Sequence, residues 1–245
     1  VMKQRLTDIS QLIDLAGVDA LKGISIDGDT VTIGAMTTQH ELITSGTLHE
    51  VAPIIREASL QIADPQVRYV GTIGGNVANG DPANDMPGLM QTIDAKYHLA
   101  GPTGERTVAA RDFYEAAYFT AREEDEILTS ISFVAKKGGY AYEKQKRKIG
   151  DYATAAAGVL LSMDDGVCSS ASIALTNLSD TPVYCDAAVE VLVGSSVDDN
   201  SITKAVKAAV EASDPVADTR GPVDFKKYVA GVIVKRAIQS AKTRV

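Results

Sequence analysis

The stretch from Tyr69 to Pro82 constrains the fold of this chain more than any other part of the sequence, because it carries five glycines and prolines within fourteen residues. Glycine and proline interrupt regular helices and strands. Before it, Ala63-Asp64-Pro65 predicts the end of a helix; after it, Asp85 as N-cap and Pro87 in the first turn predict the start of another. We therefore expect a long irregular loop over residues 63–88. Loops of this kind in compact domains usually carry function.

Within this loop, residues 72–76 (T-I-G-G-N) are candidates for contacting an anion. Adjacent glycines allow positive φ and let the backbone approach a ligand without interference from a Cβ atom. Successive N–H groups in such a turn form a concave site for anions such as a diphosphate. The alternative is a tight structural turn, since paired glycines are common. The surrounding polar side chains favour a ligand: Thr72, Asn76, Asn79 and Asp85.

Several common kinds of site are excluded by the residue inventory. The sequence has no G-x-G-x-x-G opening a helix and no G-x-x-x-x-G-K-S/T, so neither a Rossmann cradle nor a P-loop holds a nucleotide here. No Ser/His/Asp arrangement, paired carboxylates or cysteine nucleophile stands out, and no catalytic residue is assigned. A zinc site or an iron–sulfur cluster cannot be assembled from the few scattered candidates, so redox chemistry requires an organic cofactor. Those candidates are Cys168, Cys185, His40, His49 and His98.

The composition argues against nucleic acid as a partner. The net charge is −8, from 24 Lys+Arg and 32 Asp+Glu, whereas nucleic-acid binding depends on cationic side chains that neutralise phosphates. Aromatic residues make up 5% of the chain and Trp is absent, which also disfavours base stacking. No apolar run is long enough for a membrane span, and no leader peptide is expected. We expect a cytoplasmic protein.

Residues 144–148 place four cations within five positions of this acidic chain. The alternatives are a solvated basic face, a site for a phosphate-bearing ligand, and a docking surface for an acidic partner. Tyr152 follows Gly150 and has the ring to stack on a planar cofactor, where offset stacking contributes about 0.5–1.5 kcal/mol; the alternative is a core or rim tyrosine. A second candidate docking face lies on the last predicted helix, at Lys226, Lys227, Lys235 and Arg236.

The remaining periodicity predicts an α+β chain in two domains, residues 1–137 and 138–245, divided at Gly138-Gly139. In the first domain we expect a short buried strand at 11–15, a hairpin turning at Asp27-Gly28, two helices within 38–62, and short strands between 95 and 135. In the second we expect strands at 140–146, 153–163 and 167–175. Helices should follow at 186–193, 201–213 and 222–243.

Together these segments resemble the flavin-binding subunit of the xanthine dehydrogenase family of molybdenum hydroxylases. The resemblance covers nearly the whole chain and is strongest at 34–40 (GAMTTQH), 62–69 (IADPQVRY), 71–76 (GTIGGN) and 140–157. The T-I-G-G-N motif is typical of the family. The run K-R-K-I-G-D-Y-A-T-A is typical of its aerobic carbon monoxide dehydrogenase branch, in which this subunit is the medium one.

The resemblance implies a two-part FAD-binding domain of the molybdenum-hydroxylase flavoprotein type, followed by a small C-terminal α+β domain of antiparallel strands plus helices. Asp85 would reach the ribityl or ribose hydroxyls of FAD. Tyr152 would lie against the isoalloxazine, with Lys146 in the adjacent 146–151 loop. A second glycine loop of the family, A-G-G-x-S, would lie before Val1. The diphosphate contacts would come from Thr72, Ile73, Gly74, Gly75 and Asn76.

The resemblance also implies a role as an electron relay. A molybdenum-containing large subunit would oxidise the substrate, a small subunit with 2Fe-2S clusters would pass the electrons on, and FAD would release them to a quinone or another acceptor. The complex would be a dimer of heterotrimers, able to associate with the inner face of the membrane. The alternatives are a subunit of a hydroxylase for N-heterocycles, aldehydes or aromatic thioesters, a free-standing flavin oxidase, and an assembly subunit without flavin.

Overall fold

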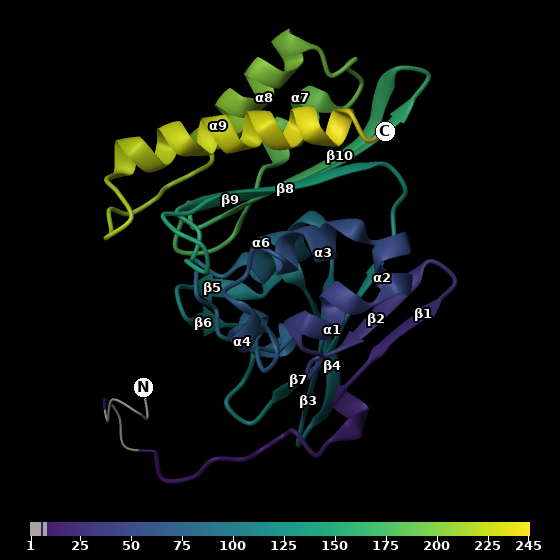
Figure 1. Cartoon of the computed structure of the whole chain (residues 1–245), viewed down its shortest axis with the longest axis vertical. Helices are drawn as coiled ribbons and strands as arrows, with labels where there is room; N and C mark the ends of the chain where they lie inside the picture. The colour runs from purple at the N-terminus through teal and green to yellow at the C-terminus, as the bar shows by residue number, and fades with distance from the viewer. Residues whose placement is uncertain (1–5, 7–8) are drawn as a thin grey trace.

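The computed structural model describes residue 6 and residues 9–245. The described chain contains two main antiparallel sheets with helices between and above them (Figure 1). The first sheet has the order β1-β2-β7-β3-β4, and the second has the order β11-β10-β9-β8. A small two-stranded sheet, β5 (Tyr114–Ala116) with β6 (Phe119–Thr120), stands apart from both. No described helix has both the length and the apolar character that crossing a membrane requires.

The first sheet begins with the predicted hairpin. Strands β1 (Ile24–Asp27) and β2 (Thr30–Gly34) pair through the turn at Gly28, where φ is +57°. Only glycine readily adopts the φ found at Gly28, so the local sequence fixes this turn. Strand β2 pairs with β7, which in turn pairs with β3. The other strands are β7 (Ile127–Val134), β3 (Lys96–Gly101) and β4 (Gly104–Ala109).

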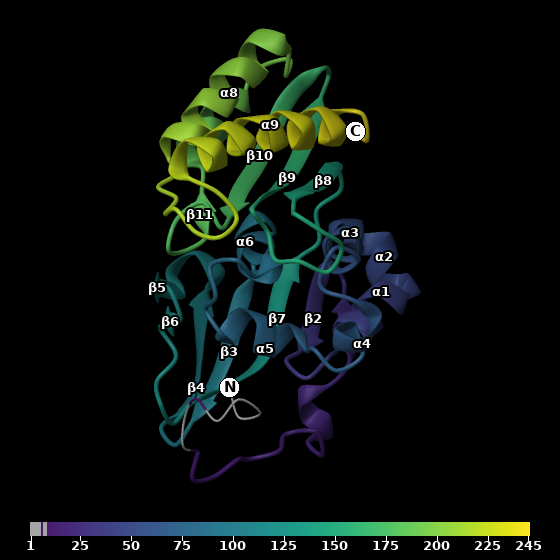
Figure 2. The same cartoon turned by 60° about the vertical axis from the view of Figure 1, so that its left-hand side comes forward.

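Six short helices accompany this sheet, and Figure 2 shows α4 and α5 on one of its faces. A capping box starts α1, because the Thr38 N–H donates to Glu41 Oε2 (2.7 Å) while the Glu41 N–H donates to Thr38 Oγ1 (3.2 Å). Two helices were expected within 38–62; three are present, because Pro53 starts a new one. The helices are α1 (Gln39–Thr44), α2 (Gly46–Val51), α3 (Pro53–Ser59), α4 (Pro65–Arg68), α5 (Ile73–Ala78) and α6 (Asp85–Thr92).

Three local expectations are wrong. Residues 63–88 are not one long loop, because the side chains of Asp64 and Thr72 cap α4 and α5 within it. Asn84 rather than Asp85 precedes α6, since the Asp85 carboxylate bonds to side chains of the second sheet instead. Residues 11–15 are largely exposed and form no strand. In residues 63–88, capping of the helix N-termini therefore allows short helices to form although glycine and proline are frequent there.

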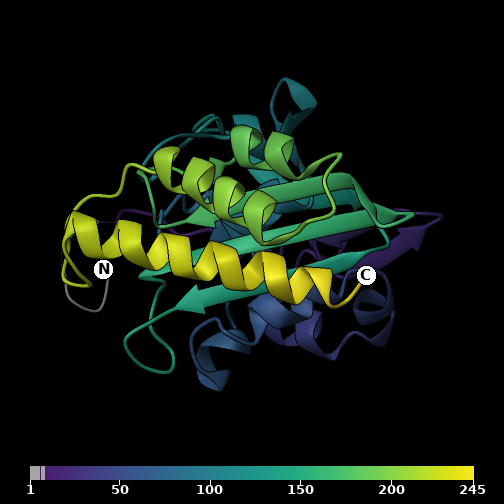
Figure 3. The ribbon, with the colours of Figure 1, turned by 90° about the horizontal axis from the view of Figure 1, so that it is seen from above.

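The second sheet is buried on both faces. Strands β8 (Gly139–Gln145) and β9 (Ala155–Asp164) receive α9 on one face, and α3 and α6 on the other (Figures 1 and 3). In β9, Ala156 faces the core of the first sheet, whereas Ala155 and Ala157 face the C-terminal helices. The predicted antiparallel strands and helices are confirmed. The others are β10 (Val167–Thr176), β11 (Val183–Tyr184), α7 (Asp186–Leu192), α8 (Asp199–Glu211) and α9 (Val223–Lys242).

Gly74 allows α5 to approach the end of β2. A Cβ atom at Gly74 would lie 2.5 Å from Ala35 Cβ and 2.6 Å from its carbonyl oxygen. The backbone cannot yield to such a contact as a flexible side chain can. We therefore expect Gly74→Ala to lower the free energy of unfolding by about 1–3 kcal/mol, the usual cost of overpacking. Urea unfolding followed by circular dichroism measures the change.

The matched control is Gly46→Ala in α2, where an added Cβ atom would meet nothing within 4 Å. This variant should be neutral, or more stable by roughly 0.5 kcal/mol, because alanine restricts the unfolded chain. Equal stabilities for the two variants would show that α5 can move away from Ala35.

Candidate cofactor site

The T-I-G-G-N motif forms the first turn of α5 rather than an irregular anion-binding turn. Neither Gly74 nor Gly75 has positive φ, so that part of the expectation is wrong. The N–H groups of three consecutive residues are already bonded within the chain. Ile73 donates to Thr37 O (2.9 Å) and Gly74 to Ala35 O (2.8 Å). Gly75 donates to Thr72 Oγ1 (3.1 Å), which satisfies the turn as an N-cap.

The outer side of this turn is open. Gly75 is exposed, and an added Cβ atom there would meet only Thr72 Oγ1, at 3.0 Å. Asn76 uses its side-chain oxygen to accept from the Met86 N–H (3.3 Å) and its backbone oxygen to accept from Asn84 Nδ2 (2.9 Å). Within the part of the chain that the structure describes, no acceptor is bonded to Asn76 Nδ2. The turn therefore presents a smooth backbone surface and an amide donor, and it is joined to the start of α6.

Asp85 at the start of α6 forms a buried ion pair with β8. Lys144 Nζ lies 2.7 Å from Asp85 Oδ2, and the two side chains are 1% and 5% exposed. Tyr142 Oη donates to Asp85 Oδ1 at 2.7 Å. Burial raises the pKa of Asp85, and the Lys144 ammonium and the Tyr142 hydroxyl oppose the rise. The pair ties the first sheet's helices to the second sheet beside Asn76.

Lys146 belongs to a group of cations around the segment that follows α3. Its Nζ donates to Gln61 O (3.3 Å), which also accepts from Lys144 Nζ (3.2 Å). Arg68 donates to the carbonyls of Ile62 (2.8 Å) and Ala63 (3.2 Å). Burial lowers the pKa of Lys146, and the nearby charge of Lys144 adds to the decrease. The cations Arg68, Lys144 and Lys146 outnumber the one nearby carboxylate, that of Asp85. The site therefore has a net positive charge in an acidic protein.

Tyr152 lies on the connection between β8 and β9 and is 48% exposed. Gly150, two residues earlier, has φ +81° and lies near Ala63 (3.6 Å from its ideal Cβ position). The ring of Tyr152 faces the guanidinium of Arg220, 5.6 Å from the ring centroid. The fold therefore brings this connection close to the residues just before α4, the helix that carries Arg68.

Two cations of the basic stretches are buried in ion pairs, whereas others stay exposed, so the docking faces stay a prediction for the exposed ones. The side chain of Lys144 is buried against Asp85, and that of Lys226 is 1% exposed and pairs with Asp218 at 3.0 Å. Arg147 pairs with Asp151 (2.9 Å). The cations that stay exposed on these two stretches are Lys148, Lys235 and Arg236, with Arg147 exposed beside its partner.

Four residues that make contacts within the candidate cofactor site were not predicted from the sequence. Arg68 was visible within the family-like block 62–69, and Tyr142 sits two residues before Lys144 on the same face of a predicted strand. Gln61 acts through its backbone carbonyl, which the sequence cannot reveal. Arg220 comes from a connection far along the chain and gave no local signal.

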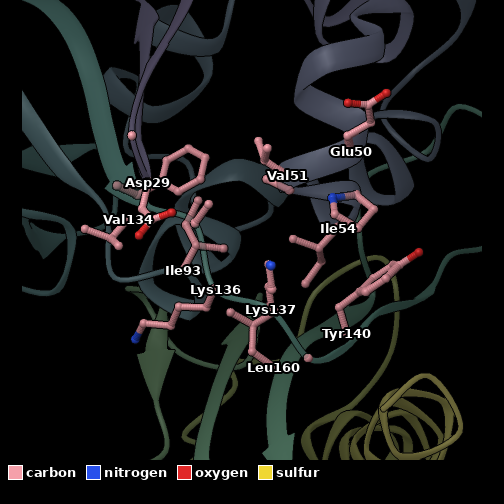
Figure 4. Close-up of a pocket in the computed structure, with 16 residues that line it drawn as sticks. Asp29, Glu50, Val51, Ile54, Ile93, Val134, Lys136, Lys137, Tyr140 and Leu160 are labelled. Carbon is pink, nitrogen blue, oxygen red and sulfur yellow. The ribbon is translucent and has the colours of Figure 1, made fainter.

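A cavity of about 300 Å³ lies at the other end of β8, between the β1–β2 turn, the α2–α3 junction and the linker that precedes β8 (Figure 4). Its wall is mostly apolar and includes Ile54, Ile93 and Leu160. None of the predicted site residues lines it, so it is not the candidate cofactor site. Its rim has balanced charges and favours no single ligand class; the charged residues are Asp29, Glu50, Lys136 and Lys137.

Comparisons with known proteins decide the family. Residues 1–133 match the FAD binding domain in molybdopterin dehydrogenase, and residues 140–241 match the CO dehydrogenase flavoprotein C-terminal domain. The chain belongs to this flavoprotein family. FAD as the cofactor, the oxidoreductase class and the α+β two-part architecture are thereby confirmed, whereas the roles of individual residues stay predictions.

Similar proteins match over nearly all of this chain and over most of their own length. The carbon monoxide dehydrogenase medium chain of Afipia carboxidovorans is 55% identical, covering 100% of this chain and 85% of that one. The medium chain from Hydrogenophaga pseudoflava is 40% identical, with 100% and 86% covered. Reconstituted CO dehydrogenase from Oligotropha carboxidovorans superposes with a TM-score of 0.98 at 54% identity, covering 100% of this chain and 86% of that one. Quinoline 2-oxidoreductase from Pseudomonas putida gives 0.94 at 32% identity, with 99% and 85% covered.

The buried pair predicts an asymmetric response to substitution. Asp85→Asn leaves the Lys144 ammonium buried without a counter-charge, and breaking a buried pair from one side costs about 3–5 kcal/mol. Replacing both partners by apolar residues costs much less. We therefore expect the double variant Asp85→Leu/Lys144→Met to be more stable than Asp85→Asn. Urea unfolding of the FAD-free chain measures both.

The control is the pair Lys207–Glu211 (3.7 Å), whose side chains are 77% and 66% exposed. Lys207→Met should change the free energy of unfolding by no more than about 0.5 kcal/mol. A loss for Asp85→Asn no larger than this would mean that the buried pair does not hold the two sheets together.

Proposed function

We propose that this chain is the FAD-carrying medium subunit of an aerobic carbon monoxide dehydrogenase, in which it passes electrons from 2Fe-2S clusters to a quinone or another acceptor. The observation that carries the proposal is the 55% identity to a carbon monoxide dehydrogenase medium chain across the whole chain. Relatives whose names refer to other substrates are less similar, as with the nicotine 6-hydroxylase medium subunit at 29%. The carbon monoxide branch is therefore favoured over a hydroxylase for N-heterocycles.

The residues at the candidate site fit FAD. A diphosphate carries negative charge. The α5 turn is joined through Asn76 to the start of α6, where Asp85 pairs with Lys144, and Lys144 and Lys146 share the Gln61 carbonyl. Thr72 to Asn76 would hold the diphosphate with the exposed backbone of Gly75 packed against it and Asn76 Nδ2 as the donor. Asp85 already accepts two hydrogen bonds, and an ionised carboxylate has room for more, which leaves capacity for a ribityl or ribose hydroxyl.

The chain's own contribution is binding, orientation and electrostatics, since FAD supplies the redox chemistry. A fixed group of cations favours negative charge on a nearby group, because partial burial reduces screening by water. Lys146 would contribute one such charge and Tyr152 a flat surface for the isoalloxazine. A relay needs no acid–base pair from the protein. This fits the sequence, in which no catalytic residue is assigned.

The metal centres would belong to other polypeptides. Among the described residues, no group of His, Cys, Asp or Glu could hold a metal ion. Cys168 and Cys185 are both free and buried in the second core, and two cysteines are too few for an iron–sulfur cluster. In keeping with the family resemblance, we assign molybdenum to a large subunit and the 2Fe-2S clusters to a small one, in a cytoplasmic dimer of heterotrimers.

Gly75 tests the placement of the diphosphate. Gly75→Val adds a side chain to the open face of α5, and its Cβ atom would meet only Thr72 Oγ1, so the fold should persist. If the diphosphate approaches this face, the affinity for FAD should fall by roughly tenfold or more. Fluorescence titration with FAD measures it, and Gly46→Val is the control. A folded Gly75→Val chain with unchanged FAD affinity would move the diphosphate away from α5.

Reconstitution tests the relay. The isolated chain, loaded with FAD, is mixed with carbon monoxide and an artificial acceptor, before and after the molybdenum and iron–sulfur subunits are added. We expect turnover only after both additions, because the proposal assigns the metal centres that oxidise the substrate to those two subunits. Copper alongside molybdenum in the native complex supports carbon monoxide as the substrate. Turnover by the isolated chain would favour the free-standing flavin oxidase instead.

A further inference from the structure

The connection between α8 and α9 reaches the loop that carries Tyr152. Both connections lie at the same end of the second sheet (Figure 1). Arg147 Nη1 donates to Thr219 O at 3.1 Å, and the Arg220 guanidinium lies 5.6 Å from the centroid of the Tyr152 ring. A cation within about 6 Å of an aromatic centroid is attracted to the ring face. Two neighbouring residues of one connection thus hold two residues of the other.

Arg220 is itself held in one orientation. Asp218 Oδ1 accepts from the Arg220 backbone N–H (2.8 Å), and Asp218 Oδ2 accepts from Arg220 Nη1 (2.9 Å). The same carboxylate pairs with the buried Lys226 at 3.0 Å. Partial burial acts to raise the pKa of Asp218, but the bonds from Arg220 and Lys226 bring it below its ordinary value, so the carboxylate stays ionised. Lys226 anchors this arrangement to the first turns of α9.

The turn around Arg220 is also fixed by its backbone. Asp218 and Gly221 exchange two hydrogen bonds, of 3.2 and 3.1 Å. Gly221 has φ +155°, and an added Cβ atom would lie 2.5 Å from the ring of Phe225. These backbone contacts fix the turn and so hold the Arg220 guanidinium in one position. The Arg220 side chain is 19% exposed.

Arg220 also lies at the boundary between the two halves of the chain. Tyr118, beside the β5–β6 pair, donates its N–H to Gly80 O (2.7 Å), just beyond α5. Partial burial raises the pKa of Tyr118, the nearby Asp81 adds to the rise, and the charge of Arg220 opposes it. The Arg220 charge therefore acts on Tyr118 of the first half as well as on the Tyr152 ring.

We propose that Arg220 is a positioning residue for the flavin: it holds the Tyr152 ring in one orientation and places a fixed positive charge behind that ring. The inference rests on the proposed function, in which Tyr152 lies against the isoalloxazine. A fixed cation stabilises added negative charge more than it stabilises the neutral state. Arg220 would therefore make the bound FAD easier to reduce.

The first test needs no cofactor. In the FAD-free chain, Arg220→Met removes the charge and the planar group while keeping an apolar stem of comparable length. Backbone amides of residues 146–152 should exchange hydrogen faster in this variant, because Tyr152 loses its neighbour. The control is Arg244→Met, which removes a guanidinium 4.6 Å from the Tyr140 ring at the other end of β8. It should leave exchange in 146–152 unchanged.

The second test uses the FAD-loaded chain. Arg220→Met should alter the visible flavin spectrum and move the midpoint potential to a more negative value. Arg220→Lys keeps the charge and should restore most of the potential, which a merely structural role would not require. Arg244→Met should match the unsubstituted chain in both measurements.

Tyr152→Ala separates the inference from the proposed function. If Tyr152→Ala changes the spectrum while Arg220→Met changes neither spectrum, potential nor exchange, the role of Arg220 is refuted and the flavin assignment stands. If Arg220→Met alters the potential and Arg220→Lys does not restore it, the charge has no part and the proposal is overturned. A chain that binds no FAD at all contradicts the proposed function itself.

Discussion

The buried contact between Asp85, Lys144 and Tyr142 is the interaction on which the arrangement of the two sheets depends. It joins the start of α6 to β8 at bonds of 2.7 Å, with the ion-paired side chains almost excluded from water. Because a buried charge without its partner is strongly unfavourable, separating α6 from β8 has a large free-energy cost. The α5 turn is bonded to the residue after Asp85 through Asn76, and Lys146, at the start of the Tyr152 loop, shares the Gln61 carbonyl with Lys144.

Close backbone packing supports this junction. Gly88 of α6 faces the Thr176 hydroxyl of β10, and Gly158 of β9 faces the Thr92 hydroxyl at the end of α6, both at approaches too short for a Cβ atom. Ser172 adds a hydrogen bond of 2.6 Å to the Thr92 carbonyl. α6 can therefore lie almost flat on the second sheet, which positions its first residue, Asp85, beside β8. Small residues on both surfaces thus determine where the ion pair forms.

The junction gives the two ends of β8 different surroundings. At its end the strand leads into Lys146 and the loop of Tyr152, where cations gather and the α8–α9 connection holds the ring. At its start it lines an apolar cavity whose rim charges balance. Only the first of these ends combines a positive balance with an exposed aromatic ring and an open backbone turn. That combination suits an anionic, planar cofactor such as FAD.

The sequence by itself determined the hairpin and the strands and helices of the second half, because these follow from local turn motifs and periodicity, and its resemblance to a known family gave the family and the cofactor. It could not show that Lys144 and Lys226 are buried, since burial of a lysine depends on carboxylates, Asp85 and Asp218, that only the fold brings near. Nor could it show that Arg220 faces Tyr152, a contact between residues 68 positions apart. Local sequence patterns determine turns, helix caps and the faces of strands. Long-range packing determines which charged side chains form ion pairs and which cation lies against which aromatic ring.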